Sequence, residues 1–451
     1  MNETPDLPRH DPYAALRQRN FQLYSGGRIF GTLGQQMFQA VMAWQVYQLT
    51  DSPLSLGILG LARFVPALLI SMVGGTFADT YDRRKIIVTA QVVPVSCSII
   101  LATATAGGWV RPEVVYGLVM LLGLASAFEA PARTALLPGI VRPETFANAV
   151  TVNNIFQKLG SVSGPTIAGF LIGGVGISTA YAAVSVLVVV GVSPILMLKL
   201  NVPPAQGRKF SLAAMKEGLA FVLERQVILG SMSLDLMAMV FGGAQALLPV
   251  YATDVLDVGP TGFGLLASSL QVGAFAMSFV LVFLPPIQRT GRALVWTVAA
   301  FGLLTMVFGL SRELWLSLLV YSLIGAADQI SVVMRQTTIQ MATPDELRGR
   351  VSSVHQVFVQ SANQINAMES AFVATLTSAA FAIVSGGAIA TAIAGFIGWR
   401  MPVLYRYQLA QGSAASLEAR RSRIAVQEPV ALAAPGATPS DPRDYTERAG
   451  S

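Results

Sequence analysis

Six ionisable residues stand inside long apolar stretches of this sequence and are the first candidates for chemistry. They are the acids Asp235, Asp328 and Glu369 and the bases Arg28, Arg63 and Lys158. A charge inside a bilayer costs about 2.5–3.5 kcal/mol on insertion scales, so residues of this kind mark ion or substrate pathways. An acid whose surroundings differ on the two sides of a membrane can bind a proton on one side and release it on the other. The set predicts proton coupling inside a substrate cavity.

Depth along the chain favours one pair among these residues. Counted from the ends of the expected spans, Asp235 lies about nine residues in and Arg28 about eight, roughly 12–14 Å at 1.5 Å per residue. The equal depth predicts that Asp235, as the proton carrier, pairs with Arg28 across two halves of the molecule. In the alternative, the bases extend to the membrane interface and the acids are structural hydrogen-bonded groups. Asp328, nearer a span end, could instead belong to a gate.

A loop motif follows the second apolar stretch. Residues 74–85 place an acid, Asp79, four residues after Gly75, and the basic pair Arg83 and Arg84 eight and nine residues after it. Glycine lets neighbouring helices approach closely. The carboxylate of Asp79 can accept from Arg83 or from the N-terminus of a helix in the other half, where negative charge is favoured. The motif predicts a latch on the cytoplasmic side, and the alternative is a basic loop with incidental acids.

A second motif combines small residues with a central proline. The glycines Gly160, Gly164 and Gly169 surround Pro165 within one apolar stretch. Proline removes a backbone hydrogen bond and bends a helix, while glycines four residues apart form a close-packing face. The motif predicts a bent, tightly packed helix, and plain packing without a transport role is the alternative.

These two motifs resemble the loop signature of the major facilitator superfamily and the antiporter signature of its exporters. Stretches 43–50, 128–138 and 347–351 are similar to its branch of drug and siderophore exporters, which includes enterobactin and macrolide exporters. The resemblance covers roughly residues 15–400. It implies efflux of a small amphipathic molecule, coupled to a cation or a proton, without a cofactor.

The resemblance also extends to the gate and has limits. Glu129 and Arg133, in the second of those stretches, are assigned with the loop motif to the cytoplasmic gate. Thr80 and Asp82 stand where Arg and Gly are usual in the loop signature. The fourth span lacks the mid-membrane arginine of many proton-driven drug exporters, so the proton relay of those proteins is not transferred to this chain.

The elements that hold these residues are membrane helices. Only 12% of the 451 residues are charged and 53% are hydrophobic, whereas soluble proteins carry about 25% charged residues. A bilayer core of about 30 Å needs about 20 apolar residues per helix. Twelve spans meet that criterion: 21–48, 55–78, 86–107, 113–131, 147–172, 176–199, 226–251, 260–284, 293–310, 313–335, 352–377 and 381–399.

Basic residues test this arrangement. Segments expected on one side hold 25 of the 30 Lys and Arg residues, and the opposite loops hold only Arg111 and Arg312. Because cytoplasmic loops are enriched in Lys and Arg, both termini are predicted in the cytoplasm of a multi-pass inner-membrane protein.

Internal repeats divide the chain in two. Residues 51–59 recur at 258–266 with Pro, Gly and Leu 207 positions apart, and Pro143-Glu144 recurs as Pro344-Asp345. Repeated halves about an axis along the membrane normal are a transporter architecture. The sequence predicts an all-α membrane protein of twelve transmembrane helices in two pseudo-symmetric six-helix bundles. Its parts are a cytoplasmic segment (1–20), a first half (21–199), a linker with an amphipathic helix (200–225), a second half (226–400) and a disordered cytoplasmic tail (401–451).

Composition excludes other classes. The chain has one cysteine and two histidines, so no disulfide framework or metal site is expected. It lacks a phosphate-binding loop and a clustered catalytic set, so we expect neither an ATP-driven pump nor an enzyme. The net charge of +6 lies largely in loops and tail, where it favours lipid over nucleic acid. We predict a monomeric proton-coupled exporter of drug or siderophore type, able to confer drug resistance; the alternative is an importer or facilitator.

Overall fold

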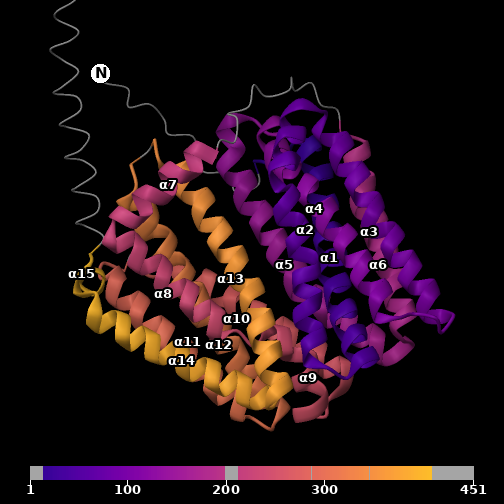
Figure 1. Ribbon diagram of the computed structural model, residues 1–451. Helices are drawn as coiled ribbons and strands as arrows, with labels where there is room; N and C mark the ends of the chain where they lie inside the picture. The colour runs from indigo at the N-terminus through magenta and orange to yellow at the C-terminus, as the bar shows by residue number, and fades with distance from the viewer. Residues whose placement is uncertain (1–13, 199–211, 286, 345, 409–451) are drawn as a thin grey trace, which may run out of the picture.

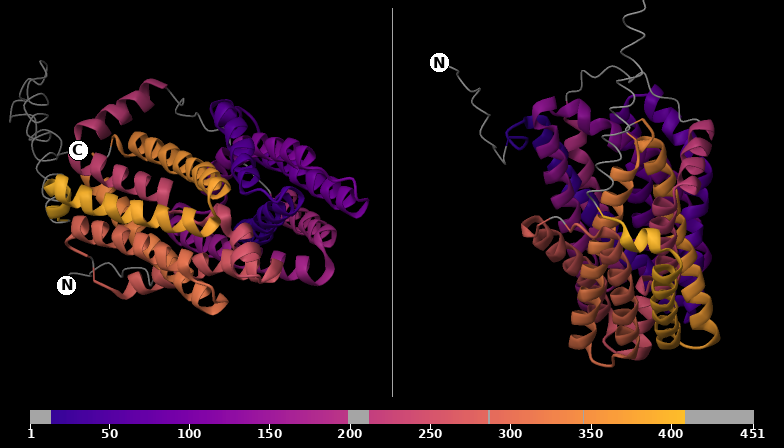
Figure 2. Two further views of the ribbon diagram at one scale, coloured as in Figure 1. Left: turned by 60° about the horizontal axis from the view of Figure 1, so that its bottom comes forward. Right: turned by 90° about the vertical axis from the view of Figure 1, so that its left-hand side faces the viewer.

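The described chain consists of long helices joined by short turns. The computed structural model describes residues 14–198, 212–285, 287–344 and 346–408, with the side chains of 72–76, 78–79 and 212–215 outside that description. These residues form helices and turns and no strand. Figure 1 shows the helices in two groups side by side, and the left view of Figure 2 separates the groups from another direction.

The first group holds six helices that correspond to the first six predicted spans. They are α1 (Arg19–Thr50), α2 (Pro53–Thr80), α3 (Arg83–Ala106), α4 (Pro112–Ile140), α5 (Phe146–Val175) and α6 (Ile177–Leu196). Prolines begin α2 and α4, where a fixed φ suits the first helical turn. The chain leaves α1 through Asp51 in the left-handed conformation, with φ of 46°.

The second group holds the other long helices and several short ones. They are α8 (Gln226–Gly242), α10 (Gly259–Phe283), α11 (Thr290–Leu310), α12 (Leu314–Ala342), α13 (Arg348–Leu376) and α14 (Ala379–Arg400), with short helices η2 (Gln245–Leu247), α9 (Leu248–Val250), η3 (Tyr251–Val255) and α15 (Pro402–Arg406). The segment predicted as a disordered tail thus begins with α15, and its residues from 409 lie outside the description, as do residues 1–13.

Helix α7 (Leu212–Glu224) occupies the predicted linker helix. It packs against α13, with Val222 buried and an ion pair between Glu217 and Arg350. The linker helix is therefore attached to the second group. The rest of the linker, 199–211, lies outside the described residues.

Two predicted spans differ from the observed helices. The fourth and tenth were expected to end at 131 and 335, but α4 and α12 continue to Ile140 and Ala342. The added turns contain polar residues such as Arg133, Gln336 and Gln340, so a criterion of apolarity alone ended those spans too early. The seventh, 226–251, is broken after Gly242, and the chain continues through η2 and α9 into the π-helical turn η3.

Neighbour relations repeat between the groups. In the first group α1 packs on α5 and α6, α2 on α4, and α3 on α4 and α6. In the second, α8 packs on α13 and α14, α10 on α12, and α11 on α12 and α14. Two contacts between the groups also correspond through the repeat and are called exchanged pairs here: α2 packs on α13, and α5, the equivalent of α13, packs on α10, the equivalent of α2. The helix packing therefore shows the same duplication that the sequence repeats predicted.

Nine helical segments in the described chain are long and apolar enough to cross a membrane. The other three long helices, α1, α5 and α13, have 32, 30 and 29 residues but are more polar. Exposed polar residues at helical spacing form a stripe on α13: Ser352, Gln356, Gln360 and Asn363. Helices α5 and α13 lie at the boundary between the groups (Figure 1), which is therefore more polar than the flanks.

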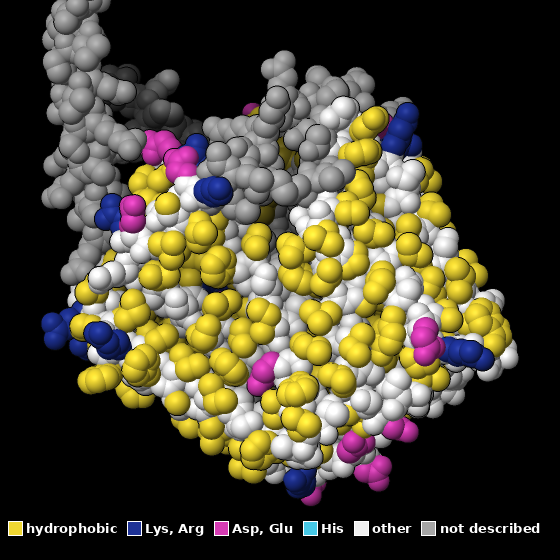
Figure 3. Space-filling model, viewed as in Figure 1, with side chains coloured by type: hydrophobic (Ala, Val, Ile, Leu, Met, Phe, Trp, Pro, Cys, Tyr) yellow, Lys and Arg dark blue, Asp and Glu magenta, His cyan; other side chains and the backbone are white. Residues whose placement is uncertain are grey.

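The flanks are strongly apolar. Large side chains such as Leu69, Val282, Trp315 and Trp399 are 74–79% exposed, and hydrophobic side chains cover the face shown in Figure 3. Exposed apolar area on this scale would be unstable in water. The molecule is a multi-pass membrane protein.

The groups meet most closely near the end that carries the α1–α2 turn (residues 51–52), called here the α1–α2 end; the other is the α2–α3 end. A methyl group added at Gly169 of α5 would lie 2.5 Å from the carbonyl oxygen of Pro260 and 2.8 Å from the Cα of Gly264 on α10. Thr166 Oγ1 donates to Ser268 Oγ at 2.6 Å in the same contact. Glycine is required there because the two backbones touch.

We predict that Gly169→Ala destabilises the protein by about 1–3 kcal/mol, the usual effect of overpacking. Gly174→Ala, on the same helix, is the matched control because its added methyl group would meet nothing within 4 Å. Thermal unfolding of both purified variants in detergent checks the difference. Equal transition temperatures for the two variants would contradict the close approach of α5 and α10.

Candidate substrate and ion-coupling site

A buried ion pair connects two helices of the second group. Asp235 on α8 binds Arg335 on α12, and the two residues are 5% and 3% exposed. Arg335 Nε also donates to Nε2 of His355 on α13, at 3.1 Å. The three side chains tie α8, α12 and α13 together inside one group.

The predicted pairing of Asp235 with Arg28 is wrong in this structure. Arg28 lies nine residues after Arg19, the first residue of α1, and Asp235 nine residues after Gln226, the first residue of α8. The two positions are equivalents in the repeat, 207 residues apart. Their equal depth therefore follows from the repeat, and each residue interacts within its own group.

Arg28 belongs to a charged cluster in the first group. Glu129 forms an ion pair with Arg133 one turn along α4, and Gln91 Nε2 of α3 donates to Glu129 Oε1 at 2.5 Å. Arg28 lies within electrostatic range of both α4 charges, and Arg63 of α2 within range of Glu129.

Two residues predicted for the cytoplasmic gate lie inside a helix. Glu129 and Arg133 were assigned to that gate, and the fourth span was expected to end at residue 131. Helix α4 runs to Ile140, so Arg133 lies seven residues inside it and is 8% exposed. The pair therefore lies in the interior of the first group, and its role in a gate stays a prediction.

Asp328 occupies the middle of its helix. It lies fourteen residues from both Leu314 and Ala342, the ends of α12. The prediction that it sits nearer one end, with the gate, is wrong because the span was ended too early. Asp328 lies within electrostatic range of Lys158 on α5, a base of the other group.

Glu369 lies beside the break between α8 and η2. Asn366 Nδ2 on α13 donates to the carbonyl oxygens of Val240 and Gly243 at 2.9 and 3.2 Å. Ser370 Oγ lies 3.3 Å from both the Gly243 oxygen and Glu369 Oε2. Side chains of α13 thus satisfy carbonyls that the broken helix leaves free, and Glu369 is half-buried next to them.

The loop motif is only partly described. Gly75 and Asp79 lie in the last two turns of α2, and their side chains are outside the described residues. Arg83 donates to the carbonyl oxygen of Ala135 and Arg84 to that of Leu198, both at 3.0 Å. The basic pair therefore fastens α3 to α4 and to the end of α6, within the first group.

The glycine motif has two packing faces. Methyl groups at Gly160 and Gly164 would lie 2.9 Å from Thr32 and 2.7 Å from Gln36 of α1, so these glycines seat α5 on α1. Pro165 and Gly169 instead face Gly264 of the second group. One helix thus holds its own group together and contacts the other.

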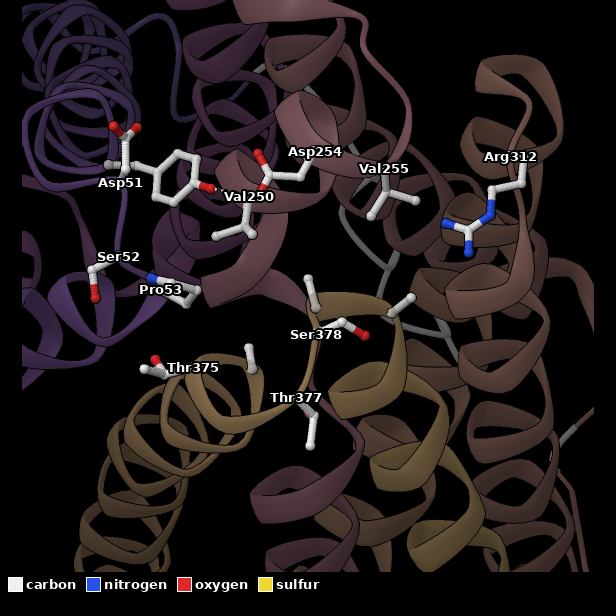
Figure 4. A pocket seen from close by; sticks show the side chains of 14 residues that line it. Asp51, Ser52, Pro53, Val250, Asp254, Val255, Arg312, Thr375, Thr377 and Ser378 are labelled. Carbon is white, nitrogen blue, oxygen red and sulfur yellow. Dashed lines mark hydrogen bonds between the residues drawn. The ribbon is translucent and has the colours of Figure 1, made fainter.

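The α1–α2 end is closed by contacts between the groups. Tyr47 Oη on α1 donates to Asp254 Oδ2 on η3 at 2.6 Å, the dashed line in Figure 4. Trp44 packs against Phe263 with ring centroids 5.4 Å apart. Outside these contacts lies a pocket of about 530 Å³ that residues of both groups line.

Several of these residues were missed by sequence reasoning. Arg335 is the last residue of the tenth predicted span, and His355 is one of the two histidines for which no metal site was expected. Continuing the helical period of the tenth span past 335 would have placed Arg335 inside the helix. No sequence signal pointed to the Tyr47–Asp254 contact, which depends on the arrangement of the groups.

Comparison with known proteins places these features in a family. Residues 10–429 match the family described as transmembrane secretion effector. The chain is 27% identical over 318 residues to the enterobactin exporter EntS of Escherichia coli O1:K1, covering 69% of this chain and 74% of that protein. It is 29% identical over 319 residues to the EntS of Citrobacter koseri, with the same coverage.

Solved structures share the fold. A point mutant of the nucleoside transporter NupG superposes with a TM-score of 0.67 at 12% identity, over 85% of this chain and all of that one. A bacterial homologue of the lysosomal transporter Spinster, described as inward-facing and unoccupied, has a TM-score of 0.63 at 14% identity, over 91% of this chain and 98% of that one.

We predict that Asp235→Asn and Arg335→Gln each lower the free energy of unfolding by about 3–5 kcal/mol, because either change leaves one buried charge without its partner. The double variant should lose less than the sum of the two. Glu217→Gln, in the exposed pair with Arg350, is the control and should cost no more than about 1 kcal/mol. Denaturation of the four purified variants measures these differences; additive losses in the double variant would contradict the pairing.

We predict that Tyr47→Phe opens the α1–α2 end, because it removes a hydrogen bond to a carboxylate, an interaction of about 1.5–3 kcal/mol. Spin labels at Ser52 and Thr377, in a Cys97→Ala background, should report a larger population of long distances. Tyr116→Phe is the control, since its hydroxyl bonds to Ser55 within the first group. An unchanged distance distribution for Tyr47→Phe would show that this contact does not hold the end closed.

Proposed function

Because this chain belongs to the transmembrane secretion effector family of the major facilitator superfamily, we propose that it exports small amphipathic molecules by proton antiport. The enterobactin exporters among its relatives make a siderophore of that kind the first cargo to test. Drug-like molecules of similar size and amphipathic character are the second class, and their export would confer drug resistance.

The observation that carries this proposal is the way the two groups meet. Their contacts are the exchanged pairs α2–α13 and α5–α10, and the closest of them lie near the α1–α2 end. Two rigid groups joined in this way can rock about the boundary and expose it to each side in turn. The polar stripe of α13 gives that boundary a surface on which a cargo with polar groups can bind.

The architecture that follows has twelve transmembrane helices in two six-helix bundles. The first bundle is α1–α6, and the second is formed by α8 with its continuation through η3 and by α10–α14. The Lys and Arg bias supports an inner-membrane protein with the α2–α3 end and both termini in the cytoplasm. The state described here is then closed to the outside, and the loop motif with Asp79 would latch the cytoplasmic end in the other state.

Proton coupling in this scheme belongs to acids that interact with the other group. Asp328 lies within electrostatic range of Lys158 of the first group, and Glu369 lies on α13, which packs on α2 of the other group. Asp235, the leading candidate from sequence, is held by Arg335 within one group. Asp328 and Glu369 are therefore the first proton carriers to test.

We predict that Asp328→Asn abolishes uphill efflux while cargo exchange across the membrane continues, because the variant has one fixed charge state. The measurement is cargo or dye uptake into everted membrane vesicles with an imposed proton gradient, with Glu369→Gln tested beside it. Asp257→Asn, an exposed acid at the α1–α2 end, is the control and should transport normally.

The outcomes separate the possible carriers and the direction of transport. Loss of uphill efflux in Glu369→Gln alone would place the carrier on α13. Full activity of both variants would contradict proton coupling through these acids. Uptake driven in the opposite direction by the same gradient would make the protein an importer.

A further inference from the structure

The first group contains a small cavity whose lining includes several polar side chains. Its walls come from α1, α2, α3, α4 and α6, and its volume is about 40 Å³. A space of that size takes a few water molecules or one group as large as a carboxylate. The polar residues that line it are Gln35, Gln39, Arg63, Gln91, Ser126 and Glu129.

The charges around this cavity do not balance. Arg63 lines it, Arg28 lies one helical turn before Gly31 of its wall, and Arg133 binds Glu129. Among the side chains that the structure describes, three guanidinium groups thus lie near a single carboxylate, Glu129, which is already paired. In the described part of the chain, Arg28 Nε is buried without a hydrogen-bond partner.

Such an excess is costly unless an anion joins it. A buried guanidinium keeps its charge and needs a partner, because an unpaired buried charge is strongly destabilising. The equivalent cluster in the second group has that partner, since Asp235 occupies the position equivalent to Arg28 and binds Arg335. The first group has a base, Arg28, at the position where the second group has this acid, so an anion from outside the chain could supply the missing partner.

We propose that the cavity lined by Arg63, with Arg28 one helical turn from its wall, binds an anionic oxygen group of the cargo, a carboxylate or an ionised phenolic oxygen. The inference rests on the proposed function and adds a substrate class to it. Arginine suits this role because its planar fork binds carboxylate oxygens in pairs. The amide groups of Gln35, Gln39 and Gln91 supply further donors, and the size of the cavity admits the anionic group while the apolar body of the cargo stays outside it.

Benzoate and benzamide test the proposal, because they share shape and differ in charge. Binding to the purified full chain in phosphatidylcholine nanodiscs is measured by calorimetry. Benzoate should bind and benzamide should not. Arg63→Gln should lower the affinity for benzoate by about tenfold or more, the loss expected when a charge-assisted bidentate contact is removed. Arg111 is an exposed arginine at the α1–α2 end, so Arg111→Gln should bind benzoate with the affinity of the parent.

Glu129→Gln provides a test that misfolding cannot imitate. Removing the carboxylate of Glu129 increases the net positive charge around the cavity, so this variant should bind benzoate more tightly than the parent does. Equal binding of benzoate and benzamide, unchanged binding in Arg63→Gln, or weaker binding in Glu129→Gln would each overturn the proposal.

Two further arms identify the source of the anion. If sulfate at equal ionic strength binds as benzoate does and is lost in Arg63→Gln, the cavity holds free anions and the cargo assignment is overturned. If phosphatidylglycerol nanodiscs abolish benzoate binding, a lipid headgroup fills the cavity, with the same consequence. Binding is measured without a gradient, so failure of efflux with intact benzoate binding would count against the proposed function alone.

Discussion

The sign of the charge inside each group is the constraint on which the other features of the site depend. Among the described positions that lie seven or more residues from both ends of a long helix, the first group carries four buried or half-buried bases and one acid, and the second carries three acids and one arginine. They are Arg28, Arg63, Arg133, Lys158 and Glu129 in the first, and Asp235, Asp328, Glu369 and Arg335 in the second. The low dielectric of a membrane makes such charges costly, so each must be paired in its group, paired across the boundary or neutralised by a bound species. The groups have the same packing and opposite charge, which suits one to anions and the other to protons.

The duplication places these differently charged residues on helices that are packed in the same way. Equivalent helices occupy equivalent places in the two groups, and even the contacts between groups are exchanged copies of each other. Departures from the repeat are therefore informative. Internal prolines occur in α2, α3, α4, α5 and α6 and in none of the described long helices of the second group. Because each removes a backbone hydrogen bond, bending is built into the first group, while the second has its irregularity at the break after Gly242.

Much of this arrangement could be predicted from sequence, and the failures have physical causes. Apolar runs located all the long helices. A helix can continue past the bilayer as long as its backbone hydrogen bonds are satisfied, so α4 and α12 extend beyond their apolar segments. Equal depth of Arg28 and Asp235 was read as contact, although a repeat produces equal depth without contact. The break in the seventh span depends on Asn366, more than 120 residues away, and a partner at that distance leaves no local signal.

Arg335 and Asp328 lie on the same helix but differ in what a movement of the groups would do to them. Arg335 is held with Asp235 and His355 inside the second group, so a rigid-body rotation carries all three together and leaves their surroundings unchanged. Asp328 lies within electrostatic range of a base on the other group, and the same rotation would change its distance from that base. A coupling group must respond to the change that exposes the cargo, because a ligand shifts an equilibrium only by its different affinity for the two states. The buried triad would therefore act as a structural connection, and Asp328 is the acid whose surroundings such a rotation would change.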